Sequence, residues 1–243
     1  MENQDFTDGP INRDENIGTS TLTKSFLSNV FTYMSAALAI TGIVAYWFGT
    51  DMSLLSLMFS AEGGMNLFGY FVLFAPLGLV LLMSARFHKF SSTTLIALFI
   101  LFSVLMGMSL SSIFAIYTGS SIASTFFITS ATFTAMAILG YTTKTDLTKF
   151  GSILMMGVIG IIIASVVNMF LDSGMMELII SIAGVLIFTG LTAYDVQKLK
   201  RIGSGVEYGT DETNKLAIMG ALSLYLDFIN IFLFLLRFTG DRK

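Results

Sequence analysis

The chain contains no cysteine, a single histidine (His88) and only two prolines among its 243 residues. The missing cysteines exclude disulfides and thiolate chemistry, and with one histidine they also exclude an ordinary His/Cys zinc site. Charge is scarce, because 12% of the residues are charged against about 25% in a soluble domain. The net charge of -3 lacks the basic excess that nucleic acid binding requires. The composition does not exclude a site in which carboxylates bind protons or calcium, since calcium prefers oxygen ligands.

Hydrophobic residues make up 54% of the chain, and the mean hydropathy is +0.80, so we expect an integral membrane protein. A membrane-spanning helix needs about 20 consecutive apolar residues. Seven runs reach this length, at about 26–49, 66–85, 92–117, 121–141, 150–171, 176–197 and 216–237. Their connections are short, so the sequence predicts one all-α membrane domain of seven helices over 25–240. A polar, mostly acidic segment over 1–24 is predicted to be a flexible tail.

Lysine and arginine alternate along the chain in a way that predicts orientation. They occur in the tail and in the loops after the second, fourth and sixth runs, and they are missing after the first, third and fifth. Because cytoplasmic loops carry an excess of these residues, the N-terminus is predicted to be cytoplasmic. A spanning seventh run would leave Arg237, Arg242 and Lys243 outside, whereas a re-entrant run would keep them inside; its length favours spanning.

The seventh run carries polar residues on one helical face. Gly220, Ser223, Asp227 and Asn230 follow a 3-4-3 spacing, which places them on one side of a helix. Such a stripe faces the bundle interior or water, so it predicts a pathway through the bundle. Asn168 in the fifth run is a further amide that needs a partner. The alternative interpretation is a single buried, protonated Asp227 that holds helices together by hydrogen bonds.

A second carboxylate, Asp195, lies near the end of the sixth run. It can pair with Lys198 on its own helix or with Asp227 on the next one. Two carboxylates that share a site cannot both ionise cheaply, so such a pair is a proton sensor or a cation site. Their depths differ, since Asp195 is about 5 Å from Lys198 while Asp227 is about 16 Å along a helix that starts at Lys215. The pair therefore requires offset helices or a later start of the seventh.

Arg86 ends the second run on the same side as Asp195. It could hold an ionised Asp195 by a charge-assisted hydrogen bond. The alternative is that Arg86 only anchors the helix end at the membrane surface.

Three stretches, "YTTKTDLTKFGSIL", "AYDVQKLK" and "MGALSLYLDFINIFLFLLRFTG", closely resemble the bacterial branch of the transmembrane Bax inhibitor motif family. The resemblance implies a seven-helix fold in which two layers of three helices wrap the C-terminal helix. It also implies a pH-sensitive calcium leak, proton sensing by Asp195 and Asp227, and a latch from Arg86 to Asp195 in the closed state. Some relatives have a glutamate where this chain has Ala75 or Pro76, so no third carboxylate ligand is expected.

We therefore expect a calcium or other cation leak channel, not an enzyme, in a bacterial inner membrane. Its gate would be Asp195 and Asp227, which would also bind calcium, and its pathway would be lined by Asn168, Ser223 and Asn230. Lipid, calcium and protons are the expected partners, with no cofactor and no nucleic acid. The alternative function is a non-channel regulator that binds a membrane protease or a cell-death component. An intramembrane aspartyl protease is disfavoured, because "LYL" precedes Asp227 in place of a Gly-x-Gly motif.

Overall fold

The computed structural model describes residues 13–60, 64–207 and 209–243, with side chains from residue 21 onward. Within these ranges the chain is helical without a β-strand, and seven of its helices are long and apolar enough to cross a membrane. The all-α membrane fold predicted from hydropathy is confirmed. The long helices are α1 (Arg13–Thr50), α3 (Leu67–Ala85), α4 (Ser92–Leu110), α6 (Gly119–Thr142), α7 (Thr148–Leu171), α8 (Gly174–Gly205) and α9 (Asp211–Thr239).

Several helix boundaries differ from those predicted. Helix α1 begins at Arg13, inside the segment predicted as a tail, whose first twelve residues lie outside the described ranges. Helix α8 continues to Gly205, well past the predicted end at 197. Two short helices, α2 (Met52–Ser56) and α5 (Ile113–Ile116), were not predicted.

The third apolar run is broken between α4 and α5 by two serines. The hydroxyl of Ser111 donates to the Met108 carbonyl at 2.6 Å, and that of Ser112 donates to the Ser109 carbonyl at 3.3 Å. Such bonds compete with the helical hydrogen bonds of the backbone. They accompany the break between α4 and α5, although similar bonds also occur inside continuous helices, such as that of Thr189 in α8.

Hydroxyl caps set where the long helices begin. A serine or threonine side chain accepts a backbone N–H from the first turn and so satisfies one of the unpaired donors there. Thr210 caps α9 in this way, and Asp211 and Glu212 follow in its first turn, where negative charge complements the helix dipole. The other hydroxyl caps of the long helices are Ser91 for α4, Thr118 for α6 and Ser173 for α8.

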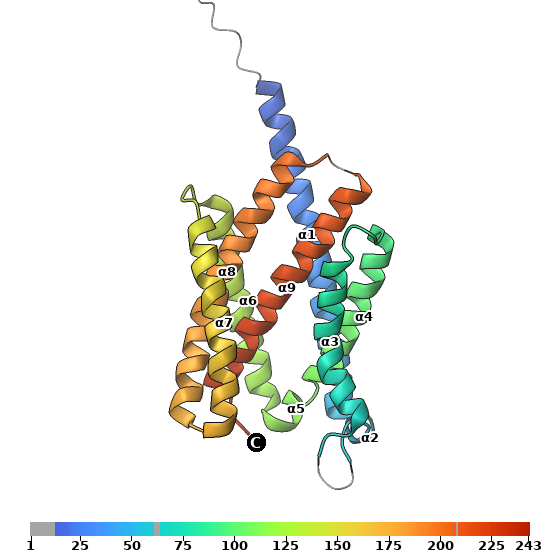
Figure 1. Cartoon of the computed structure of the whole chain (residues 1–243), viewed down its shortest axis with the longest axis vertical. Coiled ribbons are helices and arrows are strands. Elements are labelled where there is room, and N and C mark those ends of the chain that lie inside the picture. The colour runs from blue at the N-terminus through green and yellow to red at the C-terminus, as the bar shows by residue number, and fades with distance from the viewer. Residues whose placement is uncertain (1–12, 61–63, 208) are drawn as a thin grey trace, which may run out of the picture.

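Helix α9 is the most buried of the seven. In its most apolar stretch 61% of the residues are buried, against 11–33% in the other six. It packs on α1, α4, α6 and α8, and Figure 1 shows it running obliquely between the α1, α3, α4 group and the α6, α7, α8 group. Its interior position agrees with the predicted role of the C-terminal helix. The wrapping of the other six helices in two layers stays a prediction.

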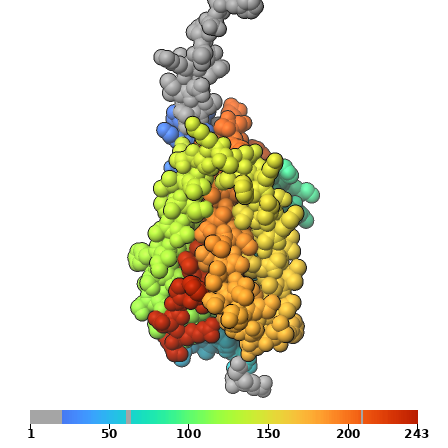
Figure 2. Space-filling view, turned by 90° about the vertical axis from the view of Figure 1, so that its left-hand side faces the viewer, coloured from blue at the N-terminus to red at the C-terminus, as the bar shows by residue number. Residues whose placement is uncertain are grey.

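Helix α9 is continuous over 29 residues, or about 44 Å at 1.5 Å per residue, which exceeds the roughly 30 Å hydrocarbon core of a bilayer. Its end lies beside the start of α8, because Arg242 pairs with Glu177 at 3.1 Å. Figure 2 shows the last residues of the chain, in red, at the surface between α6 and α8. The geometry therefore supports a spanning α9. We call this face of the bundle the Glu177 end, and the opposite face, where α8 ends and α9 begins, the basic end.

Candidate functional site

The predicted carboxylates lie along the contact between α8 and α9. Ser223 Oγ on α9 donates a hydrogen bond to Asp195 Oδ2 on α8 at 2.5 Å. Asp195 is partly buried and forms no ion pair with Lys198 within 4.0 Å. Asp195 thus has a hydrogen-bond partner on α9, but this partner is Ser223, one turn from the predicted partner Asp227.

Asp227 lies one helical turn deeper than Ser223. Its side chain is 5% exposed, and its Oδ2 is the one enclosed side-chain oxygen or nitrogen without a hydrogen-bond partner in the described part of the chain. Asp195 contacts α9 one turn away, at Ser223. Because Oδ2 makes no hydrogen bond, it does not support the alternative in which Asp227 holds helices together by hydrogen bonds.

Both helices are longer than predicted, but the depth mismatch between Asp195 and Asp227 persists, since Asp227 is about 24 Å from the start of α9 at Asp211. Ser223 matches the depth of Asp195 more closely. Asp195 is about 15 Å from the end of α8 at Gly205, and Ser223 is about 18 Å from the start of α9 at Asp211. The placement of Asp195 near the end of its helix was therefore wrong, since the apolar run ends before the helix does. Close packing supports the contact: a β-carbon at Gly220 would meet Leu199 at 2.4 Å.

A cavity of about 400 Å³ between α3, α8 and α9 reaches Asp195. Ser84, Lys198 and Ser223 also line it, whereas Asp227 does not. The cavity gives Asp195 access to small ions from the basic end. Asp227 is buried one turn deeper and does not line this cavity.

The site offers oxygen ligands, and Lys198 is a cation that lines the same cavity. Asp195, Asp227 and the Ser223 hydroxyl supply oxygens of the kind that calcium prefers. No group of three histidine, cysteine, aspartate or glutamate side chains suited to a metal occurs among the described residues.

Arg86 immediately follows α3 at the basic end. Its side chain is exposed, and it forms no ion pair with any carboxylate that the structure describes. The latch from Arg86 to Asp195 is not formed here and stays a prediction. Ser84, two residues earlier, lines the cavity beside Asp195 and was not predicted.

The two asparagines predicted to line a pathway make local bonds. Asn168 Oδ1 accepts a hydrogen bond from the Ser173 amide at 3.2 Å, at the Glu177 end of α7. Asn230 Nδ2 donates to the Leu226 carbonyl of its own helix at 2.8 Å. Helix α7 packs chiefly on α8, so the structure does not bring Asn168 to the α9 stripe.

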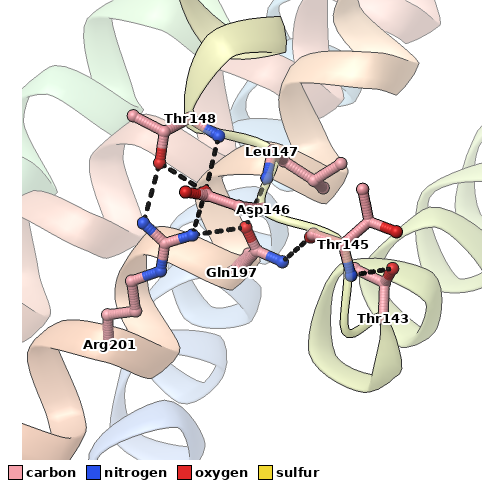
Figure 3. A network of polar contacts seen from close by, with 7 residues as sticks. All are labelled: Thr143, Thr145, Asp146, Leu147, Thr148, Gln197 and Arg201. Carbon is pink, nitrogen blue, oxygen red and sulfur yellow. Dashed lines mark hydrogen bonds and ion pairs between the residues drawn. The ribbon is translucent and has the colours of Figure 1, made fainter.

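A second polar cluster, which the sequence did not reveal, holds the α6–α7 loop at the basic end (Figure 3). Asp146 accepts hydrogen bonds from the Thr148 hydroxyl at 2.6 Å and the Thr148 amide at 3.0 Å, and it pairs with Arg201 of α8. The Thr148 hydroxyl, the Thr148 amide and Arg201 together hold the pKa of Asp146 below its usual range. The Asp-x-Thr pattern is a local signal for such a turn.

Gln197 of α8 fastens the same loop through both ends of its amide. Its Oε1 accepts from the Leu147 N–H at 2.8 Å and from Arg201 Nη2 at 2.8 Å, and its Nε2 donates to the Thr145 carbonyl at 2.8 Å. Leu147 and Thr145 lie about fifty residues from Gln197 in the chain, so no sequence spacing predicts these two contacts. The cluster ties α6 and α7 to the last turns of α8.

Comparison with known proteins agrees with this architecture. Residues 23–243 match the family model described as inhibitor of apoptosis-promoting Bax1. An uncharacterized protein of Borreliella burgdorferi is 47% identical over 90% of this chain and 92% of its own length. The inner membrane protein YbhL of Escherichia coli K12 is 42% identical, with 90% of this chain and 93% of that protein covered. The uncharacterized protein RP147 of Rickettsia prowazekii is 44% identical over 90% and 91% respectively.

Proposed function

The chain belongs to the Bax inhibitor-1-like family of membrane proteins, and we propose that it is a pH-sensitive calcium leak channel gated by Asp195 and Asp227. The observation that carries this proposal is the enclosed, unpartnered Oδ2 of Asp227 on the most buried helix. An unsatisfied buried polar group costs about 1–3 kcal/mol, and intramembrane carboxylates commonly mark ion or proton pathways. A buried carboxyl group with an unpartnered oxygen does not stabilise the helix packing, so its retention is best explained by a role in function.

The described conformation is the closed state in this proposal. Asp195 is tied to Ser223, and Asp227 does not line the cavity that reaches this pair. When both aspartates lose their protons, two like charges face each other in a medium of low dielectric constant, which is unfavourable. A passing cation relieves this repulsion, and separation of α8 from α9 extends the cavity to Asp227. Protonation of both carboxyls removes the negative charge and weakens calcium binding.

The chain is proposed to lie in a bacterial inner membrane with its basic end in the cytoplasm. The relative YbhL is an inner membrane protein by name, and the alternation of lysine and arginine between loops supports this orientation. Calcium would then leave the channel beside Asp195 and the exposed Arg86. Arg86 would compete with calcium for Asp195 in this arrangement.

The test is calcium flux into proteoliposomes between about pH 6 and about pH 8. We expect flux that varies with pH in the wild type and a flattened pH dependence in Asp195→Asn and Asp227→Asn. Asp172→Asn is the matched control, because Asp172 is an exposed carboxylate at the Glu177 end in a left-handed conformation with φ 47°, which asparagine also adopts. This control should retain the wild-type profile.

Two outcomes would overturn the proposal. Wild-type flux no greater than that of empty liposomes would remove the channel function and favour a regulator of a membrane protease or another partner. An unchanged pH profile in both aspartate variants would leave a channel whose gate lies elsewhere.

A further inference from the structure

A deep apolar cleft opens between α1 and α6. The two helices each pack on α8 and α9 but barely touch each other. The gap is a cavity of about 870 Å³, lined among others by Phe31, Leu38, Gly42, Phe133 and Tyr141. Phe228 of α9 also lines it. Because the helices on either side span the membrane, this cleft faces the hydrocarbon of the bilayer.

The cleft is long enough to hold a lipid chain. On α6 its lining runs from Phe126 to Tyr141, or about 22 Å at 1.5 Å per residue. One leaflet contributes about 15 Å of hydrocarbon, half of a 30 Å core. A second apolar cavity of about 380 Å³ shares Leu38, Gly42 and Phe126 and extends the cleft toward the Glu177 end.

A polar pocket adjoins the cleft at the basic end. It measures about 480 Å³ and is lined by Thr23, Thr143, Lys144, Asp146, Gln197, Lys200, Arg201 and Ser204. Tyr141 lines the cleft, and its ring and carbonyl both contact Lys200, which lines the pocket. Lys200 Nζ donates to the Tyr141 carbonyl at 2.7 Å and lies 4.8 Å from the centre of its ring. An apolar cleft therefore leads directly to an ammonium group at the membrane surface.

The pocket is positively charged. Three cations and one carboxylate line it, which gives a net charge of three minus one, or +2. Asp146 is already paired with Arg201, so the lysines carry the excess. Lys144 is exposed and has no ion pair with any described carboxylate. The two ammonium groups are complementary to a phosphate, and the apolar cleft beside them is complementary to an acyl chain of the same molecule.

We propose that this combined site binds an anionic phospholipid. Its phosphate lies between Lys144 and Lys200, and one acyl chain fills the cleft between α1 and α6. A transmembrane helix of another protein could cover the cleft, but it would leave the charge of the pocket unexplained. The proposal does not depend on the calcium leak.

Gly42 lines both apolar cavities and has room for a β-carbon, so it is the position at which to block the cleft. A β-carbon built on Gly42 meets no atom within 4 Å, so Gly42→Phe directs its ring into the space that both apolar cavities share. Gly160 of α7 is the matched control, because its β-carbon also meets nothing and it faces lipid away from the cleft. For the polar pocket the test variant is Lys144→Gln with Lys200→Gln, and Lys149→Gln is the control at the same end.

The experiment is native mass spectrometry of the full chain in detergent, titrated with phosphatidylglycerol or with phosphatidylcholine. We expect tighter binding of phosphatidylglycerol, and a loss of about five-fold per lysine in the double variant, the usual effect of one cation near an anionic headgroup. Gly42→Phe should weaken both lipids by about ten-fold, because its ring displaces buried methylenes. The Gly160→Phe and Lys149→Gln proteins should bind like the wild type.

Three results would overturn the proposal. Equal binding of the two lipids would remove the role of the lysines. Displacement of phosphatidylglycerol by glycerol phosphate would show a site for free phosphate that does not use the cleft. Unchanged lipid binding by Gly42→Phe, with Gly42→Leu as a second variant, would show that the chain does not enter between α1 and α6. Circular dichroism of each variant ensures that folded protein is compared.

Discussion

Replacement of Asp227 by leucine should stabilise the protein. Leucine has the same branching at Cγ, so it places methyl groups where Asp227 now has an enclosed oxygen without a partner. Removal of an unsatisfied buried polar group returns about 1–3 kcal/mol. The larger branches add packing strain of about 1 kcal/mol in a tight core. We therefore expect Asp227→Leu to raise the free energy of unfolding by up to about 2 kcal/mol while abolishing calcium flux.

A neighbouring substitution should have the opposite sign. Ser223 donates the 2.5 Å hydrogen bond that joins α9 to Asp195, and Ser223→Ala removes it. Interhelical hydrogen bonds in membrane proteins contribute about 0.6 kcal/mol on average and up to about 1.7 kcal/mol. Ser223→Ala should therefore destabilise the protein by about that amount, although it is a smaller chemical change than Asp227→Leu.

Both free energies can be measured by reversible unfolding in mixed detergent and SDS micelles, followed by circular dichroism. The decisive result is the sign of the Asp227→Leu effect. A loss of more than about 1 kcal/mol would show that Asp227 stabilises helix packing and would refute the argument that it is retained for function. A gain in stability together with unchanged calcium flux would refute the functional half alone.

Three further predictions concern other parts of the bundle. Thr41→Val should cost about 1–3 kcal/mol, more than the roughly 0.5–1.5 kcal/mol of Tyr225→Phe, because Thr41 bonds both Tyr225 and an α4 carbonyl; the reverse order in SDS unfolding would contradict this. Gly140→Ala should destabilise by about 1–3 kcal/mol, since its β-carbon would lie 2.2 Å from an α8 carbonyl oxygen; unchanged unfolding would contradict it. Above pH 3.8 the melting temperature of the wild type should exceed that of Asp146→Asn, and below this pH the difference should shrink. The reason is that the lowered pKa of Asp146 favours the folded state only while the carboxyl is ionised. A difference in melting temperature that does not depend on pH would contradict this.

The sequence predicted the bundle well because lipid imposes a strong and local rule. Every spanning segment needs about 20 apolar residues, so seven runs of that length predict seven helices. The rule fails at helix ends, where backbone hydrogen bonding continues into polar residues. Helix α8 extends to Gly205 and α9 begins at Asp211 for this reason; the first error shifted the expected depth of Asp195 and the second that of Asp227.

The candidate site was predicted in part. The 3-4-3 stripe correctly placed Ser223 and Asp227 inside the bundle, because a helical face can be read from spacing. The partner of Asp195 and the cavity beside Ser84 depend on how α3, α8 and α9 meet, which spacing does not encode. Asn168 was expected near the stripe because its amide is polar, yet the end of its own helix supplies a partner.

The most buried helix of this bundle is synthesised after the other six spanning helices that the structure describes. At about 5–20 residues per second, the 29 residues of α9 emerge over several seconds after the first six spanning helices are complete. Throughout that interval α1, α4, α6 and α8 lack the surface on which they pack. Membrane insertion and final assembly are therefore separate events for this protein. A chain truncated near Asp211 would insert six helices and still lack the core that joins them, which makes a premature stop near the C-terminus as damaging as one much earlier.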